Sequence, residues 1–388
     1  MTPTPDPTVE QLLGVSPPHV DPPAARGMRF SFLFFSDVRK EVSDARKYAF
    51  MRDITLFADR AGFEAVYIPE RHFHEFGSIY ANSAVMAAHL IPQTSRLRFR
   101  TAGISLPLHH PAEVVEWWAM NDVLSGGRVD LGFGSGWARQ DFILAPEHYE
   151  RRRQVASEMI PVVQRLWRGD TVSFPGPGGE LLPIQVFPRP LQPELTVWLL
   201  VTQSEDGFVH AGRMGYNVFT MLYGNDLEAM RHKIDLYRQA RAEAGLAPGA
   251  GVVTLMLHTL LLPDRAAVAE AVEKPFRQYI RSSLDAHLKA AAEQSGGEEL
   301  GEDEKRKVLD YAYHRYFTTG ALFGTVEDGA KVVERAIASG VDEIACLVDF
   351  GVDYSIVLDS LDVLQQLVTG FSSPGTAREI AAAGYGLP

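Results

Sequence analysis

The 388-residue sequence predicts a single (β/α)8 TIM barrel with insertions, an α/β fold in which eight parallel strands alternate with helices. Short runs of β-branched and aromatic residues alternate along the chain with longer amphipathic stretches, as is typical of βα units. Eight such units can be counted, and the first βα turn lacks the glycine-rich motif of a dinucleotide-binding open sheet. Because a barrel needs about 250 residues, we expect the remaining length to lie in insertions and tails.

Each predicted strand is a short apolar run bounded by turn residues. The strands are expected at residues 28–35, 63–68, 97–106, 128–134, 196–201, 216–221, 252–262 and 343–350. The helices have apolar residues at helical spacing. They are expected at residues 44–61, 80–91, 111–124, 147–167, 205–214 and 226–244, with a longer helical region after 262. Gly62 is a natural C-cap for the first helix, and Pro111 stands in the first turn of another, where proline is tolerated.

Three segments fall outside this alternation. Residues 1–27 contain seven prolines and little apolar content, so we expect a disordered N-terminal lead, followed by a barrel over 28–370 and a C-terminal tail over 371–388. Residues 169–193 form a Gly/Pro-rich excursion. Residues 290–307 are polar and acidic and contain three glycines, which predicts a mobile insertion that is either disordered or a lid.

The composition excludes several function classes. Lys and Arg number 37 and Asp and Glu 49, so the net charge of −12 argues against nucleic acid or an anionic membrane as partner. Cys346 is the only cysteine, which excludes an intramolecular disulfide and a multi-cysteine zinc site. The sequence has neither a signal-peptide core nor an uncharged apolar run long enough to span a membrane, so we expect a soluble cytoplasmic protein.

Polar and small residues gather where predicted strands end, which is where active sites of such barrels form. Glu70, His72 and His74 alternate after the second strand, so an extended segment would direct them to one side. Two interpretations stay open, a polar pocket lined by histidines and a metal site. Small residues at Thr101–Gly103, at the end of the third strand, would let a flat ligand approach the backbone, although they can also serve packing alone.

Two further strand ends carry candidate binding residues. Gly132, Gly134 and Gly136 recur at period two, so one face of the fourth strand lacks side chains and could lie against a planar ring; the alternative is that these glycines are structural. The turn at 202–207 begins a helix, whose N-terminal N–H groups could hold a phosphate. Its two acidic residues favour the alternative of an ordinary helix start.

Taken together, the sequence motifs of this chain resemble those of the bacterial luciferase-like, flavin-dependent monooxygenase family over roughly residues 28–370. The matching strings follow one another in the family's order. They are Gly62-Phe63-Glu64-Ala65-Val66-Tyr67, Glu70-Arg71-His72-Phe73, Phe76-Gly77, Thr101-Ala102-Gly103-Ile104, Leu106-Pro107, His110-Pro111, Ser125-Gly126-Gly127-Arg128 to Gly132, Asp141-Phe142, Gln203-Ser204, Gly324-Thr325 with Glu327, and Gly340-Val341-Asp342-Glu343.

The resemblance implies a luciferase-like barrel that binds reduced FMN at its C-terminal mouth, receives it from a separate flavin reductase and uses O2 as co-substrate. It also implies a cis peptide at Ala102–Gly103, behind the flavin. The implied cofactor-binding residues are Thr101, Ala102, Gly103, Gly132, Gly134, Ser135, Arg139, Gln203, Ser204 and Gly207. Gly134 replaces the reactive cysteine of luciferase and Ser135 its phosphate-binding arginine, so we expect Arg139 to supply the missing charge.

The implied catalytic residues are Glu70, His72 and His74, with His72 transferring the proton. Arg71 replaces another luciferase histidine, which argues against light emission. The sequence looks most similar to the subgroup associated with nonribosomal peptide and polyketide synthases, which implies antibiotic biosynthesis and a small-molecule or carrier-protein-bound acyl or aminoacyl substrate. A homodimer through helices near strands two and three is also implied. The alternatives are a deazaflavin-dependent oxidoreductase of the same fold, a non-catalytic flavin-binding accessory protein and a metal-dependent hydrolase.

Overall fold

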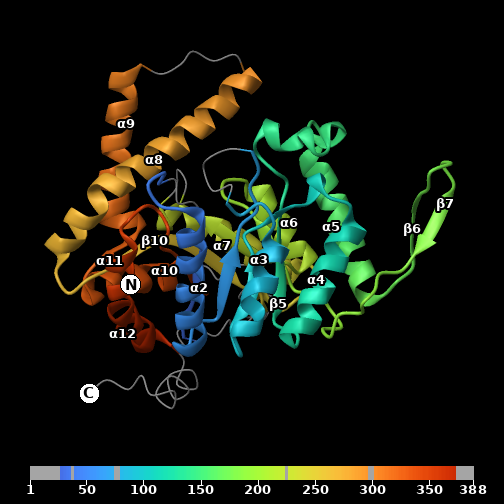
Figure 1. Ribbon diagram of the computed structural model, residues 1–388, viewed down its shortest axis with the longest axis horizontal. Helices are drawn as coiled ribbons and strands as arrows, with labels where there is room; N and C mark the ends of the chain where they lie inside the picture. The colour runs from blue at the N-terminus through green and yellow to red at the C-terminus, as the bar shows by residue number, and fades with distance from the viewer. Residues whose placement is uncertain (1–26, 36–38, 74–78, 223–225, 296–300, 373–388) are drawn as a thin grey trace, which may run out of the picture.

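A computed structural model shows a closed parallel barrel surrounded by helices (Figure 1). It describes residues 27–35, 39–73, 79–222, 226–295 and 301–372. The predicted N-terminal lead, apart from Gly27, and nearly all of the predicted C-terminal tail lie outside these residues.

Eight parallel strands close on themselves, which confirms the predicted fold class. In barrel order they are β1 (Arg29–Leu33), β2 (Ala65–Ile68), β3 (Arg98–Thr101), β5 (Val129–Gly134), β8 (Val197–Leu200), β9 (Asn217–Met221), β10 (Val253–Leu261) and β12 (Glu343–Leu347), which returns to β1. β4 (Ile104–Ser105) pairs with β5, and β11 (Leu322–Gly324) extends the sheet beside the end of β10.

The helices form an outer layer because each buries one apolar face on the barrel. They are α2 (Asp44–Arg60), α3 (Ser83–Leu90), α4 (Pro111–Ser125), α5 (Arg152–Arg168), α6 (Glu205–Met214), α7 (Leu227–Glu243), α10 (Val326–Ala338), α11 (Tyr354–Asp359) and α12 (Leu361–Phe371). Short 3-10 turns complete the connections. They are η2 (Ile91–Gln93), η3 (Leu106–Leu108), η4 (Arg139–Ile143), η5 (Pro146–His148) and η6 (Pro248–Ala250).

Two excursions leave the barrel. The Gly/Pro-rich segment contains the hairpin β6 (Val172–Pro175) and β7 (Leu181–Ile184), which projects from one side of the molecule in Figure 1. The helix pair α8 (Arg265–Ser295) and α9 (Glu302–Arg315) rises at the other side and ends in the π-helical turn η7 (Tyr316–Gly320). Among the described residues, none of the helices combines the length and apolar character that a membrane span requires.

The structure differs from the predicted elements in three places. The strand expected at 97–106 is divided into β3 and β4. The helix expected from 147 begins at Arg152, after η5. The insertion expected at 290–307 is helical where it is described, because 290–295 continue α8 and 302–307 begin α9; residues 296–300 lie outside the described residues, and the mobility of the insertion stays a prediction. At 303–307 the polar side chains lie on a largely exposed helix surface.

The closed, N-terminal end of the barrel holds a buried ionic layer. Arg100 lies on β3, and its guanidinium donates to Glu343 on β12 at 2.8 Å and to Asp130 on β5 at 2.9 Å. Ser31 and Tyr67 also donate to Glu343, at 2.6 and 3.2 Å. Burial favours the protonated form of Asp130, but the hydrogen bonds and charges of the neighbouring arginines outweigh it and lower the pKa. This layer ties five strands together beneath the open end.

Candidate active site

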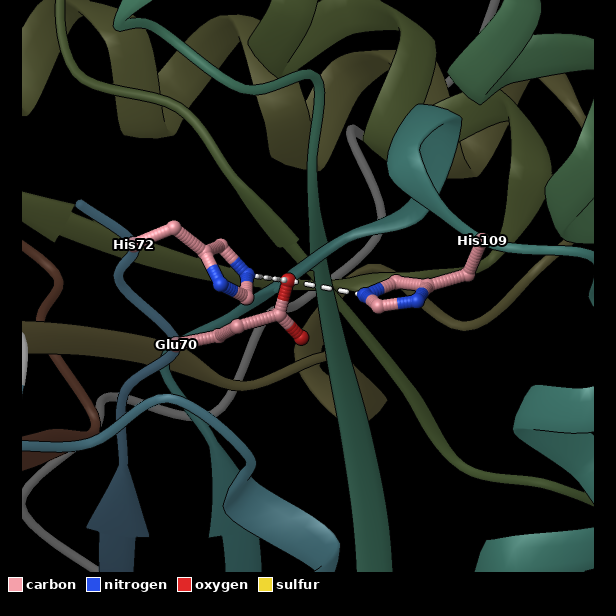
Figure 2. Close-up of side chains that lie close together, drawn as sticks. All are labelled: Glu70, His72 and His109. Carbon is pink, nitrogen blue, oxygen red and sulfur yellow. Dashed lines mark hydrogen bonds and ion pairs between the residues drawn. The ribbon is translucent and has the colours of Figure 1, made fainter. Parts of the chain in front are cut away.

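The mouth of the barrel holds a carboxylate between two histidines (Figure 2). Glu70 Oε1 lies 3.2 Å from His72 Nε2 and 2.9 Å from His109 Nε2. The Glu70 side chain is 4% exposed and each imidazole 11%, so all three groups are largely withdrawn from water. We refer to Glu70, His72 and His109 as the His–Glu–His array. His74, the other predicted catalytic residue, lies outside the described residues.

Two different βα connections supply the array. Glu70 and His72 follow β2, in a segment fixed where the Arg71 N–H donates to the Tyr80 carbonyl at 3.1 Å. His109 follows β4 and η3, and its N–H donates to the Leu106 carbonyl at 3.1 Å. The His109 ring packs edge-on against Trp117 of α4 at 5.6 Å between centroids. Both histidines are therefore held by backbone or ring contacts outside the array.

Glu70 and His109 shift each other's pKa values. Burial favours a protonated Glu70, but the hydrogen bonds and charges of His109 and His72 outweigh it and lower the pKa of the carboxyl. Burial likewise opposes a charged His109, but its hydrogen bond to Glu70 and the Glu70 charge raise the pKa of the imidazole. Nearby, burial raises the pKa of Asp141 to about 6 against the opposing charges of His72 and Arg71. The mouth thus combines Glu70, whose pKa is lowered, with His109 and Asp141, whose pKa values are raised.

The array has the composition of a metal site, since its three donor atoms lie within 4.8 Å of one another. In the structure these atoms are satisfied by hydrogen bonds within the array. Among the described residues, the third donor beside Glu70 and His72 is His109. The metal interpretation of Glu70, His72 and His74 stays a prediction, because His74 lies outside the described residues.

The predicted flavin wall lies on β3, β4 and β5. The Ala102–Gly103 peptide is cis, as the resemblance implied. Thr101 Oγ1 donates to the Gly132 carbonyl and accepts from the Gly132 N–H, each at 2.7 Å. A Cβ at Gly132 would overlap the Thr101 carbonyl oxygen, and one at Gly103 would come within 2.8 Å of the Gly132 carbonyl oxygen. These two glycines therefore serve the close approach of β3 to β5.

Gly134 differs from Gly132 because its side-chain position is open. Of the atoms in the described residues, a Cβ there would meet Leu200 Cδ2 alone, at 4.0 Å. Gly132 is buried, whereas Gly134 and Ser135 are partly exposed toward the mouth. Gly132 is thus needed for packing, whereas Gly134 leaves free space at the end of the strand. That space fits a flat ring lying against the strand end.

The predicted phosphate turn is the start of α6. Ser204 caps this helix, and its Oγ accepts the Gly207 N–H at 3.1 Å, so that N–H is already bonded. A Cβ at Gly207 would lie 2.5 Å from Val201 Cγ2, so glycine is needed for packing there. Gln203 and Ser204 are exposed and remain available to an anion. The binding roles of these residues, and of the exposed Arg139 on η4, remain predictions.

A buried lysine near this turn was missed from sequence. Lys233 lies on α7, is 7% exposed and donates from Nζ to the Thr202 carbonyl at 3.2 Å. Burial lowers its pKa against the opposing charge of Glu205. Because Thr202 directly precedes the predicted phosphate residues, Lys233 is a second source of positive charge beside Arg139. A lysine within an amphipathic helix gives no sequence signal for this role.

Buried residues on the opposite side of the mouth were also missed from sequence. His258 of β10 is 3% exposed, and its ring lies edge-on to Phe276 and Tyr279 of α8, each at 4.8 Å between centroids. Its Nε2 is buried and has no hydrogen-bond partner within the described part of the chain, and burial lowers the pKa of the imidazole to about 3. Arg71 is also buried, with its guanidinium 4.0 Å from the Phe35 ring centre, and burial lowers its pKa to about 10. The helix α8 thus closes this side of the mouth with aromatic rings.

Comparison with known proteins adds a family match. Residues 28–343 match the family model described as luciferase-like monooxygenase. The chain is 25% identical over 370 residues to the oxygenase component of a flavin-dependent trigonelline monooxygenase from Acinetobacter baylyi, covering 91% of this chain and 98% of that protein. It is 28% identical over 303 residues to an FMNH2-dependent dimethylsulfone monooxygenase from Pseudomonas putida, covering 76% and 81%. Another relative matches over only 50% of its own length.

Solved structures agree on the fold. Monooxygenase RslO1 from Streptomyces bottropensis superposes with a TM-score of 0.72 at 22% identity, covering 87% of this chain and 98% of that one. An F420-dependent secondary alcohol dehydrogenase in complex with an F420-acetone adduct superposes with a TM-score of 0.67 at 17% identity, covering 88% and 98%. At these identities the likeness is one of fold.

Proposed function

This chain belongs to the luciferase-like monooxygenase family, and we propose that it is the oxygenase component of a two-component enzyme that uses reduced FMN and O2 to oxygenate an organic substrate. The observation that carries the proposal is the mouth of the barrel. There, the open position at Gly134 leaves room for a flat ring, and the His–Glu–His array supplies buried titratable groups. Two monooxygenase relatives whose names specify flavin or FMNH2 support this choice of cofactor.

The chain's own residues would bind and orient the cofactor. Gly134 and the Ala102–Gly103 peptide would face the ring, while Gln203 and Ser204 would hold the phosphate at the start of α6. Lys233 or Arg139 would balance the phosphate charge. When bound, reduced FMN supplies the electrons for O2 activation. The aromatic rings of α8 that surround His258 would exclude water from that side of the site.

The array would handle protons. His72 is the residue that we expect to accept or return a proton at the mouth, because its ring is held by Glu70 and it is the histidine retained in the family string. Glu70 would fix the orientation of that ring. Proton transfer by a positioned side chain contributes about 10²–10⁴-fold to catalysis.

The partners follow from the same proposal. A separate reductase would deliver reduced FMN, as the component name of the trigonelline relative suggests. A homodimer is supported by apolar side chains exposed on α3 and α4, the helices near β2 and β3. These are Val85, Met120, Val123 and Leu124, with exposures of 66%, 53%, 42% and 60%. The substrate would be a small organic molecule or an acyl or aminoacyl group on a carrier protein in natural-product biosynthesis, and the enzyme would work in the cytoplasm.

The proposal is tested by product formation with labelled O2. Candidate free and carrier-bound substrates are incubated with reduced FMN, a reductase and 18O2, and products are examined by mass spectrometry. We expect incorporation of one labelled oxygen atom and a reduced-FMN oxidation rate that depends on the protein. Failure to bind reduced FMN, together with oxygen uptake unaltered by the protein, would contradict the proposal.

A deazaflavin-dependent oxidoreductase is the second candidate, because an F420-dependent dehydrogenase shares the fold over 88% of this chain. Comparing the oxidation of reduced FMN and reduced deazaflavin by the same preparation separates the two. Tight flavin binding with no substrate-dependent product would instead indicate a non-catalytic accessory protein.

A further inference from the structure

The hairpin β6–β7 stands apart from the barrel (Figure 1), and we refer to residues 172–193, which contain it, as the arm. Its two strands pair with each other, whereas the other described strands all belong to the barrel sheet. Pro175 ends β6 and Pro183 lies within β7, so we do not expect further strands to add to its edges. A two-stranded hairpin is at best marginally stable in water unless it packs on another surface.

The base of the arm is fixed to the barrel. The Leu191 N–H donates to Asp122 Oδ2 of α4 at 2.6 Å, and the Trp167 ring N–H donates to the Gln192 carbonyl at 2.9 Å. Val186 is only 2% exposed. These contacts fix the direction in which the arm leaves the barrel.

The outer part of the arm carries apolar side chains on both faces. Leu181 and Leu182 are neighbours on β7, so they point to opposite faces of the hairpin. Their exposed fractions are 69% and 42%. Within the described part of the chain, neither face of the hairpin is therefore covered at these residues. Both faces offer apolar surface that a second molecule can cover.

The apolar surface of the arm continues the exposed apolar face of α3 and α4. Leu191 is 60% exposed, and its N–H contacts Asp122, which directly precedes Val123 and Leu124 of that face. Phe187, also on the arm, is 64% exposed. A stable interface takes about 800 Å² and about 20–30 residues from each partner. Four exposed side chains on α3 and α4 are too few for such an interface, and the arm doubles their number.

The charge of the arm indicates which molecule covers it. The arm contains one acidic residue, Glu180, and one basic residue, Arg189, so its formal charges cancel, whereas the whole chain carries −12. Two copies of an acidic protein repel each other, and the repulsion is weakest where the facing surfaces have no net charge. A strongly charged partner would instead be matched by a surface of the opposite charge. The arm therefore fits a second copy of this chain.

We propose that the arm is a dimerisation element, which packs its apolar side chains on a second copy of this chain and enlarges the interface of α3 and α4. In a two-fold dimer the same surfaces of both copies meet, so each copy gives one arm and receives one. The inference rests on the homodimer of the proposed function and adds the element that stabilises it. It requires neither cofactor nor substrate.

Sedimentation velocity over a series of protein concentrations tests the proposal. We expect the unsubstituted protein to be a dimer. The double variant Leu181→Ser/Leu182→Ser should have a dimer Kd higher by about 100-fold or more, because two leucines are lost from each of two arms. The matched control is Ile143→Ser/Leu144→Ser, a neighbouring pair outside the arm with exposed fractions of 68% and 49%, which should keep the original Kd. Circular dichroism checks that both variants are folded.

Crosslinking gives a second readout that keeps both leucines out of the question of stability. Cys346 is the only cysteine and is buried, so a cysteine introduced on the arm can be labelled selectively with a photoreactive maleimide. On irradiation of the purified protein, labelled Leu181→Cys should give a covalent product of twice the chain mass of 42.9 kDa. Labelled Ile143→Cys should not give this product.

Two results would overturn the role of the arm alone. They are an unchanged Kd in folded Leu181→Ser/Leu182→Ser and the absence of a covalent dimer from Leu181→Cys. A dimer of the unsubstituted protein would in that case still support the interface of α3 and α4. A monomer at every concentration would contradict the homodimer and the arm together, while oxygenation of the substrate is decided by the separate experiment with labelled O2.

Discussion

The two ends of the barrel both bury carboxylates, but they pair them with different basic side chains. At the closed end, Arg100 contacts Glu343 and Asp130 at 2.8 and 2.9 Å, and both carboxylates are at most 2% exposed. At the mouth, Glu70 is 4% exposed and contacts two imidazoles at 2.9 and 3.2 Å. The carboxylates at the two ends are buried to nearly the same extent. The two sites therefore differ in the side chain that contacts the carboxylate.

A guanidinium stays charged at every physiological pH, whereas an imidazole gains or loses its proton near neutrality. The layer around Arg100 can therefore only hold strands together. The His–Glu–His array can also exchange protons with a bound molecule. Burial of charge is therefore found at both ends of this barrel, and the type of basic side chain that contacts the carboxylate distinguishes the two.

The largest expected effect is on stability at the closed end. Arg100→Met leaves Glu343 and Asp130 buried without their shared cation, which should lower the free energy of unfolding by about 3–5 kcal/mol. Urea denaturation followed by circular dichroism measures the change. Arg52→Met is the control, because Arg52 pairs with Asp53 at the surface and such pairs contribute about 0–1 kcal/mol. Equal losses in the two variants would contradict a structural role for the ionic layer.

The next effect is on activity at the mouth. His72→Gln should reduce labelled-oxygen incorporation by about 100-fold or more, because the proton acceptor is lost. Its unfolding free energy should change by less than about 1 kcal/mol, since the amide can still donate to Glu70. His110→Gln should retain full activity. If His72→Gln oxygenates the substrate at the original rate, His72 has no part in proton transfer.

Two glycines on β5 should respond differently to substitution by alanine, one in stability and the other in flavin binding. Gly132→Ala should destabilise the fold by about 1–3 kcal/mol, because its Cβ overlaps the Thr101 carbonyl oxygen. Gly134→Ala should leave stability nearly unchanged and weaken reduced-FMN binding, because its Cβ enters open space at the mouth. Thermal unfolding and anaerobic flavin titration measure the two effects. A reversal of this order would mean that the flavin ring does not lie against the upper glycine.

The smallest effect is a pH dependence that distinguishes the two ends. A lowered pKa makes Glu70 stabilising above its unfolded value of about 4.3, and this contribution is lost as pH falls through the folded value. A raised pKa makes His109 stabilising below its unfolded value of about 6.5, and this contribution is lost as pH rises through the folded value. The stability difference between the unsubstituted protein and His109→Gln should therefore be largest at mildly acidic pH.

The closed end supplies the control for this measurement. The stability loss in Arg100→Met should stay nearly constant from about pH 6 to pH 9, because guanidinium does not titrate there. Denaturation curves at several pH values compare the two variants. A difference for His109→Gln that is equally flat would indicate that His109 contacts Glu70 without carrying charge.

Local sequence patterns predicted much of the barrel because strands and helices follow the hydrophobic period of their own residues. Two examples that the structure confirms are the apolar run that forms β1 and the proline at the start of α4. The segment at 290–307 is the opposite case, because its glycines and acidic residues predict a mobile insertion and give no sign of a helix. There the chain is helical on both sides of 296–300, so composition alone does not predict the secondary structure.

The order of βα units, the glycines at 132 and 134, and the position of Glu70 and His72 beyond a strand end can all be read from the chain alone. The 2.9 Å contact of His109 with Glu70, the packing of Gly132 beside an open Gly134, and the enclosure of His258 by aromatic rings of α8 become visible once the chain is folded. Periodicity is a local property, whereas these contacts join segments that approach one another when the sheet closes into a barrel.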